Sequence, residues 1–312
     1  MRKIAANVLQ AIGNTPIVQL QKVAPPGYGR ILVKLESANP TGSMKDRMAL
    51  AMIEGAEADG LLQPGYTVVE YTGGSTGTSV ALVCAAKGYP LRIVTTDAAS
   101  LEKRNHMRAL GAELTIIPSD GGAVTKEMTE TMIETAREYS REPKTYWTNQ
   151  FHNPHQAGGY QAMAEEIWAQ TGGRIDAFVQ SVGTSGSLRG TAVGLRHYNP
   201  DLFVAAVEPA ESPVLSGGQT GPHKIEGMGP GFIPPKWDPA LVDEIFAVST
   251  EEAMAMARRL AREEALFAGT SSGANVVAAL RLAERLGPEA TIVTILVDTG
   301  LKYLSTELYQ GI

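Results

Sequence analysis

The sequence predicts an α/β fold of two lobes, on the basis of two patterns and the chain length. From about residue 66, and again from about residue 176, short apolar runs alternate with helical segments that open on small polar residues. Strands and helices alternating at this spacing form βαβ units around a mostly parallel sheet. At 312 residues the chain is also long enough for two domains, at roughly 150 residues per domain.

Apolar runs, helical patterns and capping residues predict the positions of the individual strands and helices. Apolar runs predict strands at 66–72, 91–96, 112–118, 176–183, 202–209 and 290–297. Helical patterns between them predict helices at 77–88, 100–111, 123–139, 184–198 (after a turn), 249–265 and 269–287. Ser249 and Glu252 form a capping box, Ser100 is a further N-cap, and Gly88 and Gly111 follow helix ends. The Gly- and Pro-rich stretch 210–239 is too long for a plain connection and predicts a functional loop.

Composition excludes several classes of function. The formal net charge is −6 and the chain has no long run of Lys or Arg, which argues against nucleic acid or an anionic membrane as a partner. The single cysteine, Cys84, lies in an apolar run and is interpreted as a small buried hydrophobe, not a nucleophile. The scattered histidines predict no metal site. The chain shows neither a signal peptide nor an apolar run of about 18 residues, which predicts a cytoplasmic protein.

Three turns rich in glycine and hydroxyl residues each precede a predicted helix. They are 72–77 "TGGSTG", 183–187 "GTSGS" and 269–273 "GTSSG". Backbone N–H groups at a helix start bind anions, and glycine lets the backbone approach a ligand closely. One such turn is weak evidence, but three favour a phosphate-bearing ligand. Neither the P-loop nor the dinucleotide fingerprint is present, which argues against ATP and NAD.

The stretch 39–47, "NPTGSMKDR", places Lys45 in a turn beside Met44. Two interpretations are open. Lys45 is either a solvated residue at a helix start, loosely paired with Asp46, or a desolvated amine with a lowered pKa that can condense with an aldehyde. Spacing alone favours the solvated lysine.

Taken together, these motifs resemble a known family. "NPTGSMKDR" resembles the lysine motif of the β-family (fold type II) of pyridoxal-phosphate enzymes, "GTSGS" their phosphate cup, and "GTSSGA" their pyridine-nitrogen serine turn. From about residue 8 to the end, the order of motifs is similar to the cysteine synthase (O-acetylserine sulfhydrylase) branch. The motifs that carry this order are "IGNTPIVQL", "QFHNP", "VEPAESPVLSGG", "GPHKIEGMGPGFIP" and "YLST".

The resemblance implies an architecture like that of the tryptophan synthase β-subunit, with the cofactor between two α/β lobes. Residues 38–152 would form a smaller mobile lobe that carries the substrate-carboxylate loop. Residues 1–37 and 153–312 would form the larger lobe with the phosphate cup. A homodimer is implied, and a serine acetyltransferase tail is a candidate partner.

The resemblance also implies how pyridoxal 5'-phosphate is bound. Lys45 would hold it as a Schiff base and later take the Cα proton of the substrate. Ser271, with Ser272 as the second candidate, would hydrogen-bond the pyridine nitrogen. Since a hydroxyl does not force a proton onto the ring, the cofactor would be a mild electron sink suited to β-elimination and β-replacement. The phosphate would be held by Gly183, Thr184, Ser185, Gly186 and Ser187.

The remaining implied residues bind the substrate. Gripping the α-carboxylate would close the lobes, exclude water and protect an aminoacrylate intermediate, from which acetate has left and to which a sulfur nucleophile adds. The residues implied for this are Thr72, Gly73, Gly74, Thr76, Gln150 and Gly227.

The chain departs from the family pattern in the substrate loop. The family has T-S-G-N-T-G where this chain has T-G-G-S-T-G. Ser75 therefore stands where an asparagine normally hydrogen-bonds the ring hydroxyl of the cofactor, and Gly73 replaces a serine of the carboxylate grip. Val297–Asp298 replaces a pattern in which proline follows the leucine. The changes in this loop affect the expected identity of the substrate more than they affect the expected fold or cofactor.

The leading hypothesis is the synthesis of L-cysteine from O-acetyl-L-serine and sulfide. The alternative is a related β-replacing or eliminating enzyme, either cystathionine β-synthase-like, serine dehydratase-like, or using another acyl-serine donor or nucleophile. A hypothesis from another class is a cofactor-binding or regulatory protein with weak catalysis.

Overall fold

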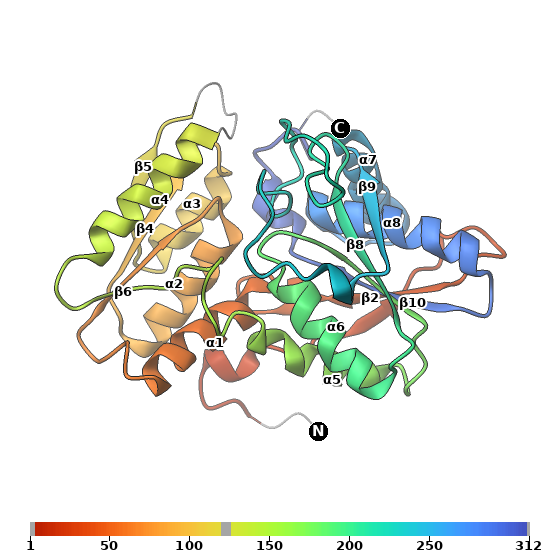
Figure 1. Ribbon diagram of the computed structural model, residues 1–312, viewed down its shortest axis with the longest axis horizontal. Coiled ribbons are helices and arrows are strands. Elements are labelled where there is room, and N and C mark those ends of the chain that lie inside the picture. The colour runs from red at the N-terminus through yellow and green to blue at the C-terminus, as the bar shows by residue number, and fades with distance from the viewer. Residues whose placement is uncertain (1–3, 120–125, 311–312) are drawn as a thin grey trace.

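The computed structural model describes residues 4–119 and 126–310, whose strands form two sheets (Figure 1). The larger sheet has six strands and is parallel except at β1, which pairs antiparallel with β2. Its order is β1 (Ile17–Gln19), β2 (Arg30–Leu35), β10 (Thr291–Leu296), β7 (Ala177–Ser181), β8 (Phe203–Pro209) and β9 (Glu244–Val248). The smaller sheet is parallel, in the order β5 (Glu113–Ile117), β4 (Leu91–Thr96), β3 (Thr67–Tyr71) and β6 (Thr145–Trp147).

The helices divide between the two sheets. Figure 1 shows the four-stranded sheet at left with α2 (Ser75–Lys87), α3 (Leu101–Ala109) and α4 (Lys126–Ser140). The six-stranded sheet at right carries α5 (Gln161–Gln170), α6 (Gly186–Tyr198), α7 (Thr250–Glu263) and α8 (Thr270–Leu286). Helix α1 (Lys45–Ala58) lies where the two lobes meet. Short 3₁₀ turns complete the described chain: η1 (Val8–Ala11), η2 (Glu36–Ala38), η3 (Gly158–Tyr160), η4 (Pro239–Leu241) and η5 (Gly300–Tyr303).

The predicted α/β fold is confirmed, and the strongest local signals form the elements they predict. The strand predicted at 91–96 is β4. The capping box opens α7, with the Ser249 hydroxyl and the Glu252 carboxylate each accepting from the backbone N–H of the other residue. Ser100 caps α3 by accepting from the N–H of Lys103. Of the helix predicted at 123–139, residues 123–125 lie outside the described residues, and the helix runs from Lys126 to Ser140.

Six helices and strands had no sequence prediction: α1, α5, β1, β2, β6 and β9. The first residue of α1 is Lys45 itself, and no side chain caps this helix start. Strand β6 has only three residues, and β9 is a partly exposed edge strand without clear alternation. Such short or uncapped elements give little periodic signal, because packing against the rest of the fold stabilises them.

Burial follows the parallel architecture. Strands β7 and β10 are buried along their whole length, as expected where helices cover both faces of a parallel sheet. Cys84 is 1% exposed in α2, and burial raises the pKa of its thiol to about 12. The thiol is therefore protonated at neutral pH, which fits a packing role. No helix in the described ranges is long and apolar enough to cross a membrane.

Two of the three predicted turns follow parallel strands: the turn at 72–77 follows β3, and the turn at 183–187 follows β7. The third, at 269–273, follows no strand and is joined to the residues after β10 by the bridge between Ala268 and Thr299. Ligands in open α/β sheets bind beyond the carboxyl ends of the strands. The division into lobes at 38–152 remains a prediction, although the four-stranded sheet is drawn from within that range.

Candidate active site

The turn before Lys45 is attached to the end of β10. The N–H of Met44 donates to the Val297 carbonyl at 2.9 Å, and the N–H of Thr299 donates to the Gly42 carbonyl at 2.9 Å. Ser43 and Asp298 form an isolated antiparallel bridge between these bonds. The lysine turn is thereby held by a strand nearly 250 residues later in the chain.

Lys45 is a desolvated lysine. Its side chain is 8% exposed, and burial lowers its pKa to about 8, against the smaller opposing effect of the Asp298 charge. The Lys45 amine makes no hydrogen bond or ion pair in the described part of the chain. Asp46 does not pair with it, since the Asp46 carboxylate accepts from the backbone N–H and hydroxyl of Thr41 and from the Ser79 hydroxyl. The solvated-lysine interpretation is therefore wrong.

The turn Gly183–Ser187 forms a tight cup at the start of α6. Ser185 has a left-handed backbone (φ 66°, ψ −10°) and is the N-cap of the helix. A Cβ on Gly183 would lie 2.5 Å from the Gly227 carbonyl oxygen, so only glycine fits there. Thr184 and Ser187 are also buried. The buried Ser185 hydroxyl has no hydrogen-bond partner among the described residues.

The turn at the start of α8 separates the two serine candidates. The Ser272 hydroxyl accepts from the N–H of Val297 at 2.9 Å. The Ser271 hydroxyl is buried and has no partner within residues 4–119 and 126–310. A buried hydroxyl without a partner costs free energy, so its presence indicates a group that it meets in the loaded protein.

These features fit pyridoxal phosphate. The cup offers backbone N–H groups, a helix N-terminus and a free hydroxyl to a phosphate. Ser271 offers a second free hydroxyl for a ring nitrogen, and Lys45 offers an amine that is partly uncharged near neutral pH. Each end of the cofactor thus has an unused partner in the protein.

The predicted substrate loop is bonded differently from the cup. Its hydroxyls are engaged: Thr72 accepts from the Gly74 N–H at 3.0 Å, and Thr76 donates to Gln150 Oε1 at 2.7 Å. The Gln150 amide also donates to the Tyr71 carbonyl at 3.0 Å. Gly73 is exposed, and a Cβ there would meet no atom within 4 Å.

Ser75, predicted to contact the cofactor, has a protein partner. Its hydroxyl donates to Asp298 Oδ2 at 3.0 Å, across the two lobes. The Tyr303 hydroxyl donates to the same oxygen at 2.8 Å. The serine at position 75 is therefore hydrogen-bonded by Asp298, which follows Val297, the residue that stands where the family has proline.

Ionisable groups surround the substrate loop. Glu70, fully buried beneath it, accepts from the Gln150 N–H at 3.0 Å and from the Thr148 hydroxyl at 2.6 Å. Burial nevertheless raises the pKa of Glu70 to about 7. Lys103, 2% exposed, packs its aliphatic stem against Gly74 and pairs with Glu226 of the larger lobe. Gly227 follows Glu226, so it lies between this pair and the cup.

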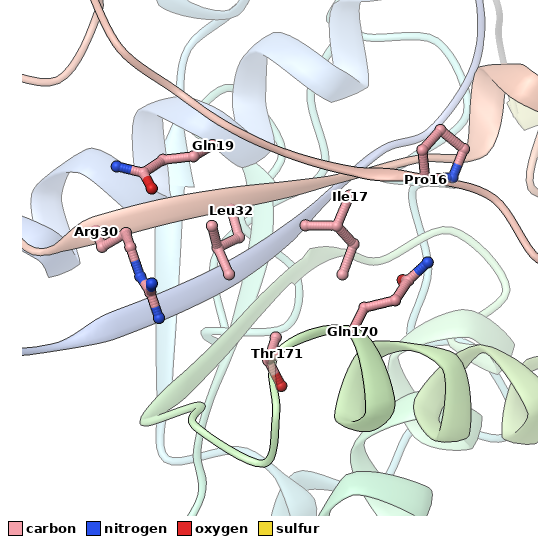
Figure 2. A pocket seen from close by; sticks show the side chains of 7 residues that line it. All are labelled: Pro16, Ile17, Gln19, Arg30, Leu32, Gln170 and Thr171. Carbon is pink, nitrogen blue, oxygen red and sulfur yellow. The ribbon is translucent and has the colours of Figure 1, made fainter.

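Of two surface hollows, the first lies outside this arrangement and the second borders the lysine turn. One of about 500 Å³ opens beside β1, β2 and the end of α5, lined by Ile17, Arg30, Leu32 and Gln170 among others (Figure 2). It contains none of the predicted site residues. A second of about 350 Å³ lies beside the lysine turn and is lined by Thr41, His106 and Lys302 among others.

Sequence reasoning missed the roles of several residues near the site. Asp298 was noted only as the neighbour of Val297, which stands where the family has proline, and Glu70, Lys103 and Glu226 were not singled out. One usable signal was present: Glu70 and Asp298 are acidic residues at the carboxyl ends of buried strands, where parallel sheets bind ligands.

Known proteins match the chain over nearly its whole length. A family model described as "Pyridoxal-phosphate dependent enzyme" matches residues 8–298. A cysteine synthase of Staphylococcus aureus is 43% identical over 311 residues, covering 99% of this chain and 98% of that protein.

Two solved structures are similar in fold. Cysteine synthase of Entamoeba histolytica has a TM-score of 0.92 at 38% identity, covering 99% of this chain and 92% of that one. A mutant O-ureido-L-serine synthase with O-ureido-L-serine bound has a TM-score of 0.93 at 38% identity, covering 99% and 95%. The chain belongs to the family of pyridoxal-phosphate dependent enzymes, with cysteine synthases among its relatives.

Proposed function

We propose that the protein makes L-cysteine from O-acetyl-L-serine and sulfide by β-replacement. The observation that carries the proposal is the buried Lys45 amine in one chain with two turns whose buried hydroxyls, Ser185 and Ser271, have no partner among the described residues. The 43% identity to a cysteine synthase supports the choice of reaction. Bound pyridoxal phosphate supplies the electron sink that makes the Cα proton acidic and the β-substituent a leaving group.

Lys45 anchors the cofactor and moves the Cα proton. With a pKa of about 8, about a tenth of its amine is uncharged at pH 7 and is able to accept a proton. Burial, which lowers this pKa, also keeps water from the reacting atoms. The net change at Cβ is the replacement of acetate by a thiol.

The three turns bind different parts of the cofactor and the substrate. Gly183, Thr184, Ser185, Gly186 and Ser187 hold the phosphate, and Ser271 donates to the ring nitrogen. The substrate α-carboxylate binds to Thr72, Gly73, Gly74 and Thr76, with Gln150 and Gly227 beside them. Thr76 and Gln150 already contact each other, so a carboxylate that binds there joins an existing hydrogen-bonded pair.

The proposal extends to the assembly and its location. Residues 38–152 act as the smaller mobile lobe, and the protein acts as a cytoplasmic homodimer able to bind a serine acetyltransferase tail. Light scattering of the pure protein, with and without a peptide from such a tail, tests the assembly.

The Lys45→Ala variant tests the core of the proposal. Loss of a positioned acid–base group lowers turnover by about 10²–10⁴-fold, and loss of the amine removes the visible absorption band of lysine-bound cofactor. The matched control is Lys22→Ala, which removes an exposed lysine of the larger lobe. An unchanged band in Lys45→Ala contradicts the assignment.

A donor panel tests the substrate. O-acetyl-L-serine with sulfide should turn over fastest, compared with O-ureido-L-serine and sulfide, serine and homocysteine, and serine alone. Two observations keep another donor or nucleophile under test: the open space at Gly73, and the similarity to a synthase that is named for a product other than cysteine. Faster turnover of another pair reassigns the substrate and leaves the cofactor assignment intact.

The Ser75→Asn variant separates an enzyme from a regulatory relative with weak catalysis. If Ser75 belongs to an adapted active site, restoring asparagine leaves turnover unchanged or lowers it. A large gain in turnover would instead indicate a degraded enzyme.

A further inference from the structure

We propose that Asp298 is a positioning residue, which holds the substrate loop on the larger lobe through the Ser75 hydroxyl. The proposal rests on the proposed function only in taking the turn at 72–76 as the place where a substrate carboxylate binds.

The backbone of Asp298 joins two other site segments. It bridges Ser43, two residues before Lys45, and its carbonyl accepts from the Gly269 N–H at 3.3 Å, at the start of α8. The neighbouring residue Thr299 bridges Ala268 in the same way. Asp298 therefore has a position fixed relative to both Lys45 and Ser271.

The carboxylate of Asp298 reaches the third segment. It is 2% exposed, and Oδ2 accepts from Ser75 and from Tyr303. The other oxygen, Oδ1, is buried without a partner among the described residues, on the side of Gly269. A buried carboxylate is costly unless donors satisfy it, so losing the Ser75 donor carries a substantial cost.

Both the hydroxyl and the backbone carbonyl of Ser75 are held by hydrogen bonds. Its hydroxyl has one proton, which goes to Asp298, so it donates no second hydrogen bond. Its carbonyl accepts from the hydroxyls of Thr78 and Ser79 in the first turn of α2. Ser75 thus holds the loop, whereas the resemblance assigns the asparagine of the family to a hydrogen bond with the ring hydroxyl of the cofactor.

The charged groups around Asp298 determine which variant removes the contact with the loop and nothing else. Lys45 on α1 and Lys302 on η5 both interact with its charge, and Tyr303 donates to it. Asp298→Asn changes all of these at once. Ser75→Ala removes only the loop contact and leaves every charge in place.

Steady-state kinetics of Ser75→Ala, Asp298→Asn and the double variant test the coupling. A hydrogen bond to a charged group predicts a KM for the amino-acid donor about tenfold higher in Ser75→Ala, with kcat nearly unchanged. If the two residues act as one unit, the double variant is no worse than Asp298→Asn. If the loss in the double variant equals the product of the losses in the two single variants, the two residues act independently and the proposal is wrong.

Amide hydrogen exchange of the segment 72–79 gives a readout that needs no turnover. In both cofactor-free and loaded protein, Ser75→Ala should exchange about tenfold faster there. The matched control is Tyr303→Phe, which removes the other donor to the same oxygen and should leave exchange of 72–79 unchanged. Unchanged exchange in Ser75→Ala, or equal acceleration in Tyr303→Phe, overturns the proposal. Failure of the donor panel leaves this measurement unaffected, so the two failures are distinguishable.

Discussion

The cup at Gly183–Ser187 and the loop at Thr72–Thr76 look alike in sequence but are supported differently. Neutral amides back the cup: Gln180 donates to the Ser187 hydroxyl, Asn275 accepts from the Ser181 N–H, and Gln156 packs against Gly186. Ionisable groups back the loop, namely Glu70, Asp298 and Lys103. The amides that support the cup do not titrate, whereas burial raises the pKa of Glu70 beneath the loop to about 7.

The two turns also differ in what their hydroxyls do. Ser185 in the cup has a free buried hydroxyl, while Thr72, Ser75 and Thr76 in the loop all bond within the protein. A site for a permanently bound cofactor keeps hydrogen-bonding groups that have no partner within the protein. A site for a substrate that binds and dissociates exchanges hydrogen bonds within the protein for hydrogen bonds to the substrate, which suits a loop that moves.

The largest difference in cofactor affinity between the two turns concerns glycine. In Gly183→Ala, the new Cβ would meet the Gly227 carbonyl oxygen, and overpacking of about 1–3 kcal/mol predicts a roughly 10–100-fold weaker affinity for the cofactor. Gly73→Ala in the loop is the matched control, because nothing lies near that Cβ. Titrating cofactor into the cofactor-free proteins measures both. Equal losses in the two variants would contradict the close packing of the cup.

The next effect concerns pH. Burial raises the pKa of Glu70 to about 7 in the folded protein, against about 4.3 in an unfolded chain. Protonated Glu70 therefore stabilises the fold below pH ~4, and this stability is lost as the pH rises through about 7, on the order of 3 kcal/mol in all.

Glu70→Gln should flatten that pH dependence, measured as the unfolding temperature between pH 5 and 9 of the variant and the unsubstituted protein. Glu289→Gln, at an exposed position, serves as the control and should follow the unsubstituted protein. If Glu70→Gln retains the full pH dependence, other groups titrate beneath the loop.

The smallest effect compares one hydroxyl from each turn. In cofactor-free protein, Ser185→Ala removes an unpartnered hydroxyl and should change the free energy of unfolding by less than about 0.5 kcal/mol. Thr76→Val removes the donor to the buried Gln150 oxygen and should destabilise by about 1 kcal/mol. Urea unfolding measures both, and a larger loss in Ser185→Ala would reverse the contrast between the turns.

The sequence by itself determined the elements whose signals are local. The strand 91–96, the Ser249–Glu252 capping box and the Ser100 cap each depend on residues within a few positions of one another. The motif around Lys45 likewise placed the lysine candidate, since its spacing is contained in nine residues.

Only the tertiary structure decided which partners meet. Ser75 and Asp298 are 223 residues apart, as measured along the chain, and Thr76 and Gln150 are 74 apart. Local patterns left Ser271 and Ser272 open, and the end of β10 chose between them by giving Ser272 the Val297 N–H. The physical reason is that each residue type fixes its own hydrogen-bond donors and acceptors. Which partner each of them meets depends on which strands end side by side in the fold.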